Sequence, residues 1–356
     1  MHTRGVRSSG ARLTGRAVST GFVVALMTAS FAHAQTELGP VTVGAGLRTS
    51  FMSTLPDSGP TTNQFSLNDI RLYVNGAAYK DVKFMFNAEY NSATNTVGVL
   101  DAVARIEVNP MFNVWAGRFL PPSDRANLYG PFFANEWNVY TDGVQDGYPF
   151  VFQGRDNGAA YWGTFAKKVK VSLGAFDGKS ATGRPEILTA ARVQIDFWDP
   201  EDGYYLNGTY YGDKNLLAIG GATQVQSGRT ATSVDFLMER KLPNNGVVTL
   251  EAEYANYNGL GGYNANYYKD QGAYGLAAYL FPKKVGVGQF QVLGKYAQAA
   301  FTHGSTASYN QKTTEFNLNY VIKQFNARVM SFCQNMRFNG QHPNAWQAGL
   351  GLQLQM

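Results

Sequence analysis

Apolar and polar residues alternate along the last eleven positions of the chain, residues 346–356. Apolar side chains occupy every second position, namely Trp346, Ala348, Leu350, Leu352, Leu354 and Met356, and only Gln or Gly stands between them. A period of two places successive side chains on opposite faces of a β-strand. The chain is therefore predicted to end in a strand with one apolar and one polar face.

The same alternation recurs through the chain, with turn residues between the alternating runs. Segments 65–79 and 82–90 are predicted to form a hairpin around a tight turn at Lys80 and Asp81. Short turns of this kind alternate with longer polar or glycine-rich loops, such as residues 53–64. This asymmetry, together with aromatic side chains near the strand ends, is typical of transmembrane β-barrels and favours a barrel over a soluble sandwich.

The number of strands follows from the alternating segments. Seventeen can be distinguished, but a barrel with both chain ends on one side needs an even number. Merging the short stretch 204–211 with 216–226 gives sixteen and places the turn at 243–246 on the periplasmic side. The predicted fold class is all-β: a transmembrane antiparallel β-barrel of sixteen strands, with fourteen or eighteen as alternatives. Sixteen strands would enclose a water-filled channel.

The longest predicted connection is residues 120–155. It is rich in aromatic residues, which would be poorly placed in open solvent, and connections of this length are usually functional. We expect this segment to fold into the barrel as a constriction loop. Its aromatic side chains either pack the loop against the inner wall or form a surface on which sugars stack.

The start of the chain has the features of a secretory signal. Residues 1–34 contain four arginines and no acid, followed by a short apolar run and an Ala-His-Ala sequence that ends at Ala34. The apolar run is shorter than the roughly 20 residues of a membrane-spanning helix. We expect cleavage after Ala34, so that residues 35–356 form the barrel. The expected location is the outer membrane of a Gram-negative bacterium, with its lipid as a partner.

Charge and cysteine content exclude several classes of function. The signal carries four of the 30 basic residues and none of the 25 acidic ones, which leaves the mature chain with a net charge of +1. Nucleic-acid binding therefore loses its main support. A single cysteine, Cys333, excludes an internal disulfide framework. No phosphate loop, dinucleotide fingerprint or metal-ligand spacing is present in the sequence, so neither a cofactor nor a metal is expected.

Several short motifs resemble a known family. They are Ile70-Arg71-Leu72-Tyr73-Val74 followed by Val82-Lys83-Phe84, then Ala116-Gly117-Arg118-Phe119-Leu120-Pro121-Pro122, and Gly154-Arg155-Asp156-Asn157-Gly158. Together they resemble the phosphate-selective porins O and P. The resemblance implies a sixteen-stranded, trimeric outer-membrane porin with a constricting third loop. Two features depart from that family: the nearly balanced mature charge, and Met356 in place of a terminal Phe or Trp.

Assigning faces by a period of two places one base from each of the first five predicted strands in the lumen. These bases are Arg48, Arg71, Lys83, Arg105 and Arg118. Acidic residues from strands roughly across the barrel face them: Asp235, Glu239, Glu251 and Glu253. Arcs of charge set ion selectivity in a channel. The alternative is that these side chains pair across adjacent strands and only solvate the wall. For Arg118, at the entry to the long loop, we favour a role in selectivity.

Two further bases stand near the ends of the long loop. Arg125 and Arg155 either line the constriction or hold the loop to the wall through Asp124 or Asp156. Both are therefore candidate pore-lining residues. Glu251 and Glu253 are the candidates on the opposite side of the pore.

The sequence favours a passive porin for small hydrophilic solutes, with a weak preference for anions such as phosphate. Two alternatives are an outer-membrane barrel enzyme and a plugged structural or adhesive barrel. Enzymatic chemistry has little support, because the mature chain contains only His303 and His342 and neither belongs to a catalytic motif. The aromatic long loop is the support for a plugged barrel.

Overall fold

The computed structural model describes residues 41–92, 95–144, 154–178, 184–260, 269–302, 308–339 and 342–356. The predicted signal peptide and its cleavage site lie outside the described residues, as does His303. The strands are β1 (Thr42–Pro56), β2 (Thr62–Tyr79), β3 (Val82–Asn91), β4 (Thr96–Asn109), β5 (Phe112–Phe119), β6 (Asp156–Phe165), β7 (Val169–Phe176), β8 (Leu188–Asp196), β9 (Leu216–Gln226), β10 (Arg229–Lys241), β11 (Val247–Asn258), β12 (Lys269–Val285), β13 (Gly288–Thr302), β14 (Tyr309–Lys323), β15 (Ala327–Asn339) and β16 (Ala345–Gln355).

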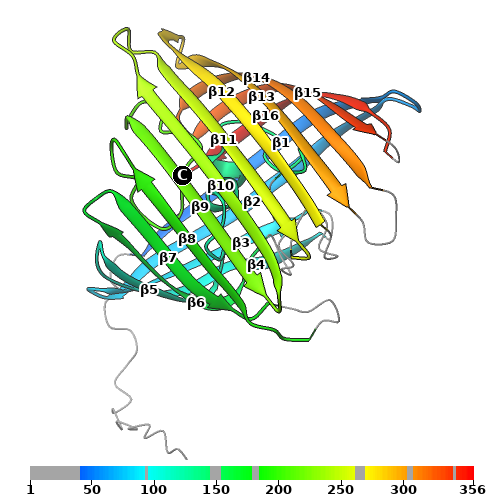
Figure 1. The fold of residues 1–356 in the computed structure, drawn as a ribbon. Helices are drawn as coiled ribbons and strands as arrows, with labels where there is room; N and C mark the ends of the chain where they lie inside the picture. The colour runs from blue at the N-terminus through cyan, green and yellow to red at the C-terminus, as the bar shows by residue number, and fades with distance from the viewer. Residues whose placement is uncertain are drawn as a thin grey trace, which may run out of the picture. The chain divides into compact units, whose positions relative to one another are not determined.

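The strands form one closed antiparallel barrel (Figure 1). Each strand pairs with its neighbour in sequence, and β16 pairs with β1 from Gly46 opposite Gln355 to Pro56 opposite Ala345. Closure leaves no free strand edge, because the first and last strands satisfy each other's backbone hydrogen bonds. The predicted sixteen-stranded barrel is confirmed.

Alternation along the strands separates an outward apolar face from an inward face. In β16, Trp346, Leu350 and Leu354 are exposed on the outside, while Gln353 is fully buried inside. Its amide donates to the carbonyl oxygen of Phe132 at 2.9 Å, which places it against the segment that fills the lumen. The predicted strand with one apolar and one polar face is therefore present, with its apolar face on the outside.

The connections divide the barrel into two ends. Turns after β2, β4, β6, β10, β12 and β14 are short and share one end, which we call the short-turn end; connections after odd-numbered strands lie at the other end, the loop end. The connection from β8 to β9, residues 197–215, departs from this division. It is long, although it follows an even-numbered strand and therefore starts at the short-turn end.

Residues 204–211 lie within that connection and are not part of a strand, so the expected merger with 216–226 is wrong. β9 begins at Leu216 and alone pairs with β8 and β10. The alternation that suggested a strand has another cause: Tyr204 and Leu206 are buried inside the barrel. Backbone hydrogen bonds from this segment go to the long loop, as from Gly208 N to the carbonyl oxygen of Phe133 at 2.9 Å.

The long loop after β5 contains the helix α1 (Arg125–Phe133), which lies inside the ring of strands (Figure 1). Asp124 caps its N-terminus by accepting a hydrogen bond from Asn127 N at 2.8 Å. Gly130 adopts a left-handed φ of 64° and Pro131 follows it, so the helix is kinked after little more than one turn. Within the described part of the chain, no helix has the length and apolar character needed to cross a membrane.

Candidate functional site

The inner wall of β1 to β3 carries charged side chains in cross-strand pairs. Arg48 stands opposite Asp69, with 2.9 Å between Nη1 and Oδ2, and Arg71 stands opposite Glu89, with 3.2 Å between Nε and Oε1. All four side chains are buried from bulk solvent. The two arginines therefore point into the lumen, as the periodicity predicted, and each one pairs with the neighbouring strand.

Lys83 and Arg105 share the carboxylate of Glu107 farther along the same wall. Lys83 Nζ lies 2.8 Å from Glu107 Oε2, and Arg105 Nε lies 3.9 Å from Glu107 Oε1. Arg105 is paired in register with Trp115, and its guanidinium lies 5.5 Å from the centre of that indole ring. Lys83 is the more exposed of the two bases, which agrees with its place near the short-turn end.

Arg118 does not line the lumen, and that expectation is wrong. In the β4–β5 register Arg105 pairs with Trp115 and Ala102 pairs with Arg118. Directly paired residues share a face and successive residues of a strand alternate between faces. Arg118 is three positions from Trp115, whose side chain points inward, so Arg118 lies on the outer face. Its Nε donates to the carbonyl oxygen of Val99 at 3.3 Å. The inner face of β5 is instead aromatic, because it packs against the in-folded residues 204–206.

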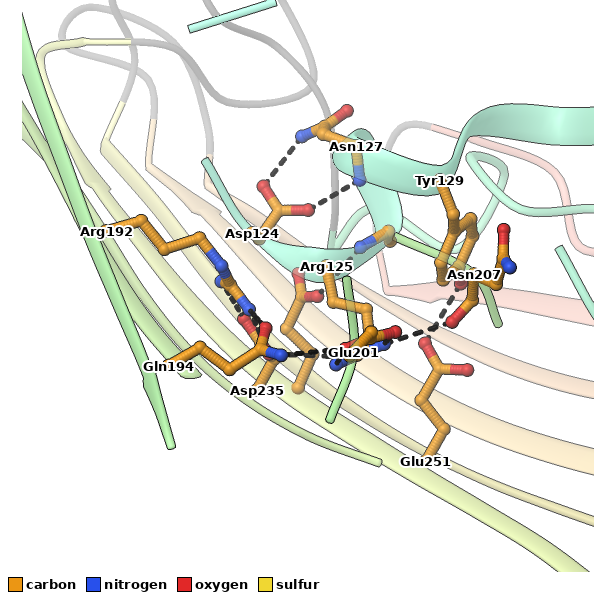
Figure 2. Close-up of polar contacts among 12 residues, drawn as sticks. Asp124, Arg125, Asn127, Tyr129, Arg192, Gln194, Glu201, Asn207, Asp235 and Glu251 are labelled. Carbon is orange, nitrogen blue, oxygen red and sulfur yellow. Dashed lines mark hydrogen bonds and ion pairs between the residues drawn. The ribbon is translucent and has the colours of Figure 1, made fainter. Parts of the chain in front are cut away.

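Arg125, the first residue of α1, joins the two in-folded connections (Figure 2). It donates to both carboxylate oxygens of Glu201, at 2.9 and 2.7 Å, and to the carbonyl oxygen of Asn207 at 3.0 Å. Its Nε lies 3.6 Å from Asp235 on β10. Burial opposes ionisation of Glu201, but the Arg125 guanidinium outweighs it and lowers the pKa of this carboxyl to about 2. Both groups are therefore charged at neutral pH.

The ion pair continues into a wider polar network on the inner wall (Figure 2). Gln194 on β8 donates to Glu201 at 2.7 Å, and Arg192 on the same strand donates to Asp235 at 2.8 Å. These side chains are fully buried. Removing one member of such a network leaves a buried charge without its partner, which typically costs about 3 to 5 kcal/mol. Arg125 thus holds the loop in place through Glu201 and Asp235, and Asp124 serves as the helix cap.

Glu251 and Glu253, the predicted acidic side of the pore, are covered by α1. Tyr129 of α1 donates its hydroxyl proton to Glu251 at 3.0 Å, and Tyr274 on β12 donates to the same carboxylate at 2.6 Å. The backbone N–H of Ala126 points at Glu253 at 3.5 Å. Burial among carboxylates raises the pKa of Tyr129, so its hydroxyl remains a donor. The acidic wall is therefore a docking surface for the loop.

Residues 134–142 of the long loop are held by strands farther around the barrel. Lys295 on β13 lies 3.0 Å from Glu136 and 2.8 Å from Asp142. Arg328 on β15 donates to the carbonyl oxygen of Ala134 at 2.7 Å. With Arg192, these two bases were not among the predicted site residues. The sequence signal that could have identified them is a basic residue at an inward-facing position of a strand in the second half of the chain.

The second in-folded segment fills the space beside β5. Tyr204 packs against Trp115, with ring centres 4.8 Å apart, and against Phe119, with ring centres 5.8 Å apart. Its hydroxyl donates to the carbonyl oxygen of Leu120 at 2.7 Å. Glu239 on β10 accepts hydrogen bonds from the backbone N–H groups of residues 210 and 212, at 2.9 and 2.7 Å, which fixes the end of the segment. The lumen therefore receives a segment from each end.

Two cavities remain along the wall formed by β1 to β4. The larger has a volume of about 550 Å³ and reaches Thr42 and Asn326 at the short-turn end. The smaller has a volume of about 340 Å³ and reaches Thr141 on the long loop. Five residues line both cavities: Arg71, Leu120, Asn127, Gly130 and Arg155. The two cavities therefore share part of their lining, which comes from the wall, from α1 and from both ends of the long loop.

Charge in the shared lining comes from two arginines. Arg155 Nε lies 2.8 Å from Asp101 Oδ1, and Arg71 is paired with Glu89. Arg48 joins them in the smaller cavity, where its guanidinium also lies 4.0 Å from the centre of the Trp137 ring. Of the predicted candidates, Arg48, Arg71 and Arg155 line these two cavities, whereas Arg125, Glu251 and Glu253 are buried in contacts between the in-folded segments and the wall.

The part of the chain that the structure describes has no cluster of three or more His, Cys, Asp or Glu residues suited to hold a metal ion. His342 lies against the rings of Tyr309 and Phe338, with ring centres 4.9 and 5.4 Å away. Cys333 is a half-buried free thiol on β15. Neither side chain belongs to the cavities described above.

Comparison with solved structures finds the same architecture in outer-membrane proteins. OprB of Pseudomonas putida aligns over 89% of this chain and 94% of its own, with a TM-score of 0.61 and 9% identity. The anion-selective porin from Comamonas acidovorans aligns over 89% and 99%, with a TM-score of 0.56 and 11% identity. OmpT of Vibrio cholerae in its trimer form aligns over 90% of this chain and 100% of its own, with a TM-score of 0.54 and 11% identity.

No protein-family model and no curated protein sequence matches the chain. At the identities found among solved structures, the likeness concerns the fold alone. The chain therefore has the sixteen-stranded barrel fold found in outer-membrane porins, with two segments folded into its lumen.

Proposed function

We propose that this protein is an outer-membrane porin for the passive diffusion of small hydrophilic solutes. The observation that carries the proposal is the pair of cavities that share Arg71 and Arg155 in their lining along one side of the lumen. The sixteen-stranded fold supports it, because such barrels are wide enough for an aqueous channel. The solute path follows β1 to β4, and the two in-folded segments narrow the remaining cross-section.

The charges that line this path support a weak preference for anions. Three arginines line the two cavities, against the carboxylates of Asp69 and Asp101. A permeating ion that gives up part of its hydration in a narrow zone meets these charges at close range, where they act strongly. Preference for phosphate, as in the phosphate-selective porins O and P, is the narrowest form of this proposal and rests on the short motifs around Arg71 and Arg155.

The proposal includes the cellular setting. The signal of residues 1–34 is cleaved after Ala34, the barrel of residues 35–356 inserts into the outer membrane with residues 120–155 as its constriction loop, and the mature chain assembles as a homotrimer. The apolar outward face of the strands supports insertion into lipid.

Recording from purified protein in a planar lipid bilayer tests the channel. We expect discrete conductance steps in potassium chloride and, in a salt gradient, a reversal potential that favours chloride. Replacing both Arg71 and Arg155 by Gln is expected to shift the reversal potential toward cations. Arg118→Gln removes the same charge from the outer face and is expected to leave it unchanged. Protein that inserts without conductance steps contradicts the proposal.

A plugged structural barrel is the second candidate, and one observation favours it. Residues 204–206 fill the lumen beside β5 from the short-turn end, while α1 enters from the loop end. Liposome swelling separates the two candidates. Uptake of small sugars supports the porin, and swelling no faster than in protein-free liposomes supports the plugged barrel.

A further inference from the structure

The larger cavity combines two arginines with apolar, aromatic and amide side chains in its lining. Arg71 and Arg155 belong to the part of the lining that it shares with the smaller cavity. Tyr73, Leu128 and Tyr205 are among the residues that line the rest of it. A cavity of about 550 Å³ is within the usual size range for small-molecule sites, which pair a mostly apolar lining with a few convergent polar groups.

The two guanidinium groups are held in place by the wall. Arg71 Nε contacts Glu89 at 3.2 Å, and Arg155 Nε contacts Asp101 at 2.8 Å. Arg71 also lies over the ring of Phe132, 5.1 Å from its centre. Groups whose orientation is fixed before a ligand arrives lose less entropy when it binds. The planar guanidinium is the side chain best suited to recognise a planar carboxylate.

We propose that the larger cavity is a binding subsite for small aromatic carboxylates on their way through the channel. The carboxylate is placed at Arg71 and Arg155, and the ring contacts Tyr73, Leu128 and Tyr205. This inference rests on the proposed porin function and names the class of solute. An aromatic carboxylate uses both features of this lining, because its charged group matches the two guanidinium groups and its ring buries apolar surface against the aromatic and aliphatic side chains.

Benzoate is the probe for this subsite in single-channel recordings. We expect benzoate to block the chloride current reversibly, with a half-blocking concentration about tenfold below that of acetate, which has the charge without the ring. Benzyl alcohol, which has the ring without the charge, is expected to block more weakly than benzoate. Equal block by benzoate and acetate, or by benzoate and benzyl alcohol, overturns the proposal.

Variants separate the two parts of the subsite. Arg155→Gln is expected to raise the half-blocking concentration of benzoate about tenfold, with Arg155→Lys between this variant and the wild type. Tyr73→Leu is expected to weaken block by benzoate and leave block by acetate unchanged, which keeps the proposal testable if Arg155→Gln does not fold. Arg118→Gln serves as the matched control. Unchanged benzoate block in both Arg155→Gln and Tyr73→Leu contradicts the subsite.

Calorimetric titration of the folded protein in detergent with benzoate gives a readout that needs no conduction. Binding that is lost in Arg155→Gln supports the subsite even if the bilayer recordings show no current, in which case the porin function fails and the subsite stands. If the protein conducts but benzoate and acetate block the current equally, the porin function stands and the subsite fails.

Discussion

Arg125 and Glu201 form a doubly hydrogen-bonded ion pair, with 2.9 and 2.7 Å between their atoms, inside the barrel. Arg125 belongs to the connection after β5 and Glu201 to the connection after β8, so the pair joins two segments that enter from opposite ends of the barrel. Because both side chains are fully buried, neither charge has bulk water as an alternative partner. The pair therefore links the two in-folded segments to each other inside the lumen.

Glu201→Gln is expected to loosen residues 199–212 and lower the stability of the barrel by about 3 kcal/mol, because Arg125 loses its main counter-charge. Urea unfolding followed by tryptophan fluorescence measures the loss. Asp202→Asn is the matched control, since the Asp202 side chain is mostly exposed. If the porin proposal holds, the Glu201→Gln channel also shows a larger conductance than the wild type. Equal stability of the two variants contradicts the role assigned to the pair.

Acid should release the same segment only at low pH. The pKa of Glu201 is about 2 in the folded protein, below its ordinary value of 4.5, so ionisation of Glu201 stabilises the fold. That contribution is complete above about pH 4.5 and is lost as the pH falls toward 2. We expect the stability difference between wild type and Glu201→Gln to persist from pH 7 to 5 and to shrink below pH 4. A difference that disappears already at pH 6 rules out this carboxyl as its source.

Gly351→Val is expected to push the long loop away from β16. A Cβ atom at Gly351 would lie 2.5 Å from the ring of Trp137, which stacks on Phe332 with ring centres 5.8 Å apart. Overpacking of this kind costs about 1 to 3 kcal/mol. The urea midpoint should fall, whereas Gly275→Val should not lower it, because a Cβ at Gly275 meets no atom within 4 Å. Similar midpoints for the two variants contradict the predicted clash.

Gln353→Leu is expected to destabilise the barrel by about 1 to 3 kcal/mol. Gln353 accepts a hydrogen bond from Arg328 at 2.8 Å and donates to the carbonyl oxygens of Phe132 and Phe325, all in buried surroundings. Leucine would leave these groups unsatisfied. Gln347→Leu, on the same face but only partly buried, should change stability by less. Thermal melting monitored by circular dichroism gives the comparison.

Arg118 shows where reasoning from the sequence failed. Polar side chains were assigned to the lumen because an open channel is wet, and this rule was correct for Arg48 and Arg71. It failed on β5, whose inward residues Trp115 and Phe119 pack against Tyr204. An in-folded segment makes the inner wall locally apolar around Trp115 and Phe119, and Arg118 lies on the outer face. The buried side chains of this in-folded segment also give residues 204–211 an alternating pattern that resembles a strand.

Most of the strands and the barrel class could be predicted from the sequence, because they depend on local alternation with a period of two and on the positions of turns; residues 204–211 were the exception. The tertiary structure decided which charges meet. Arg125 and Glu201 are 76 residues apart, and Asn319 on β14 contacts Asn135 across 184 residues. No local pattern encodes pairings of this kind. They form because buried charged and polar groups inside a closed barrel are stable only beside partners that the folded chain brings to them.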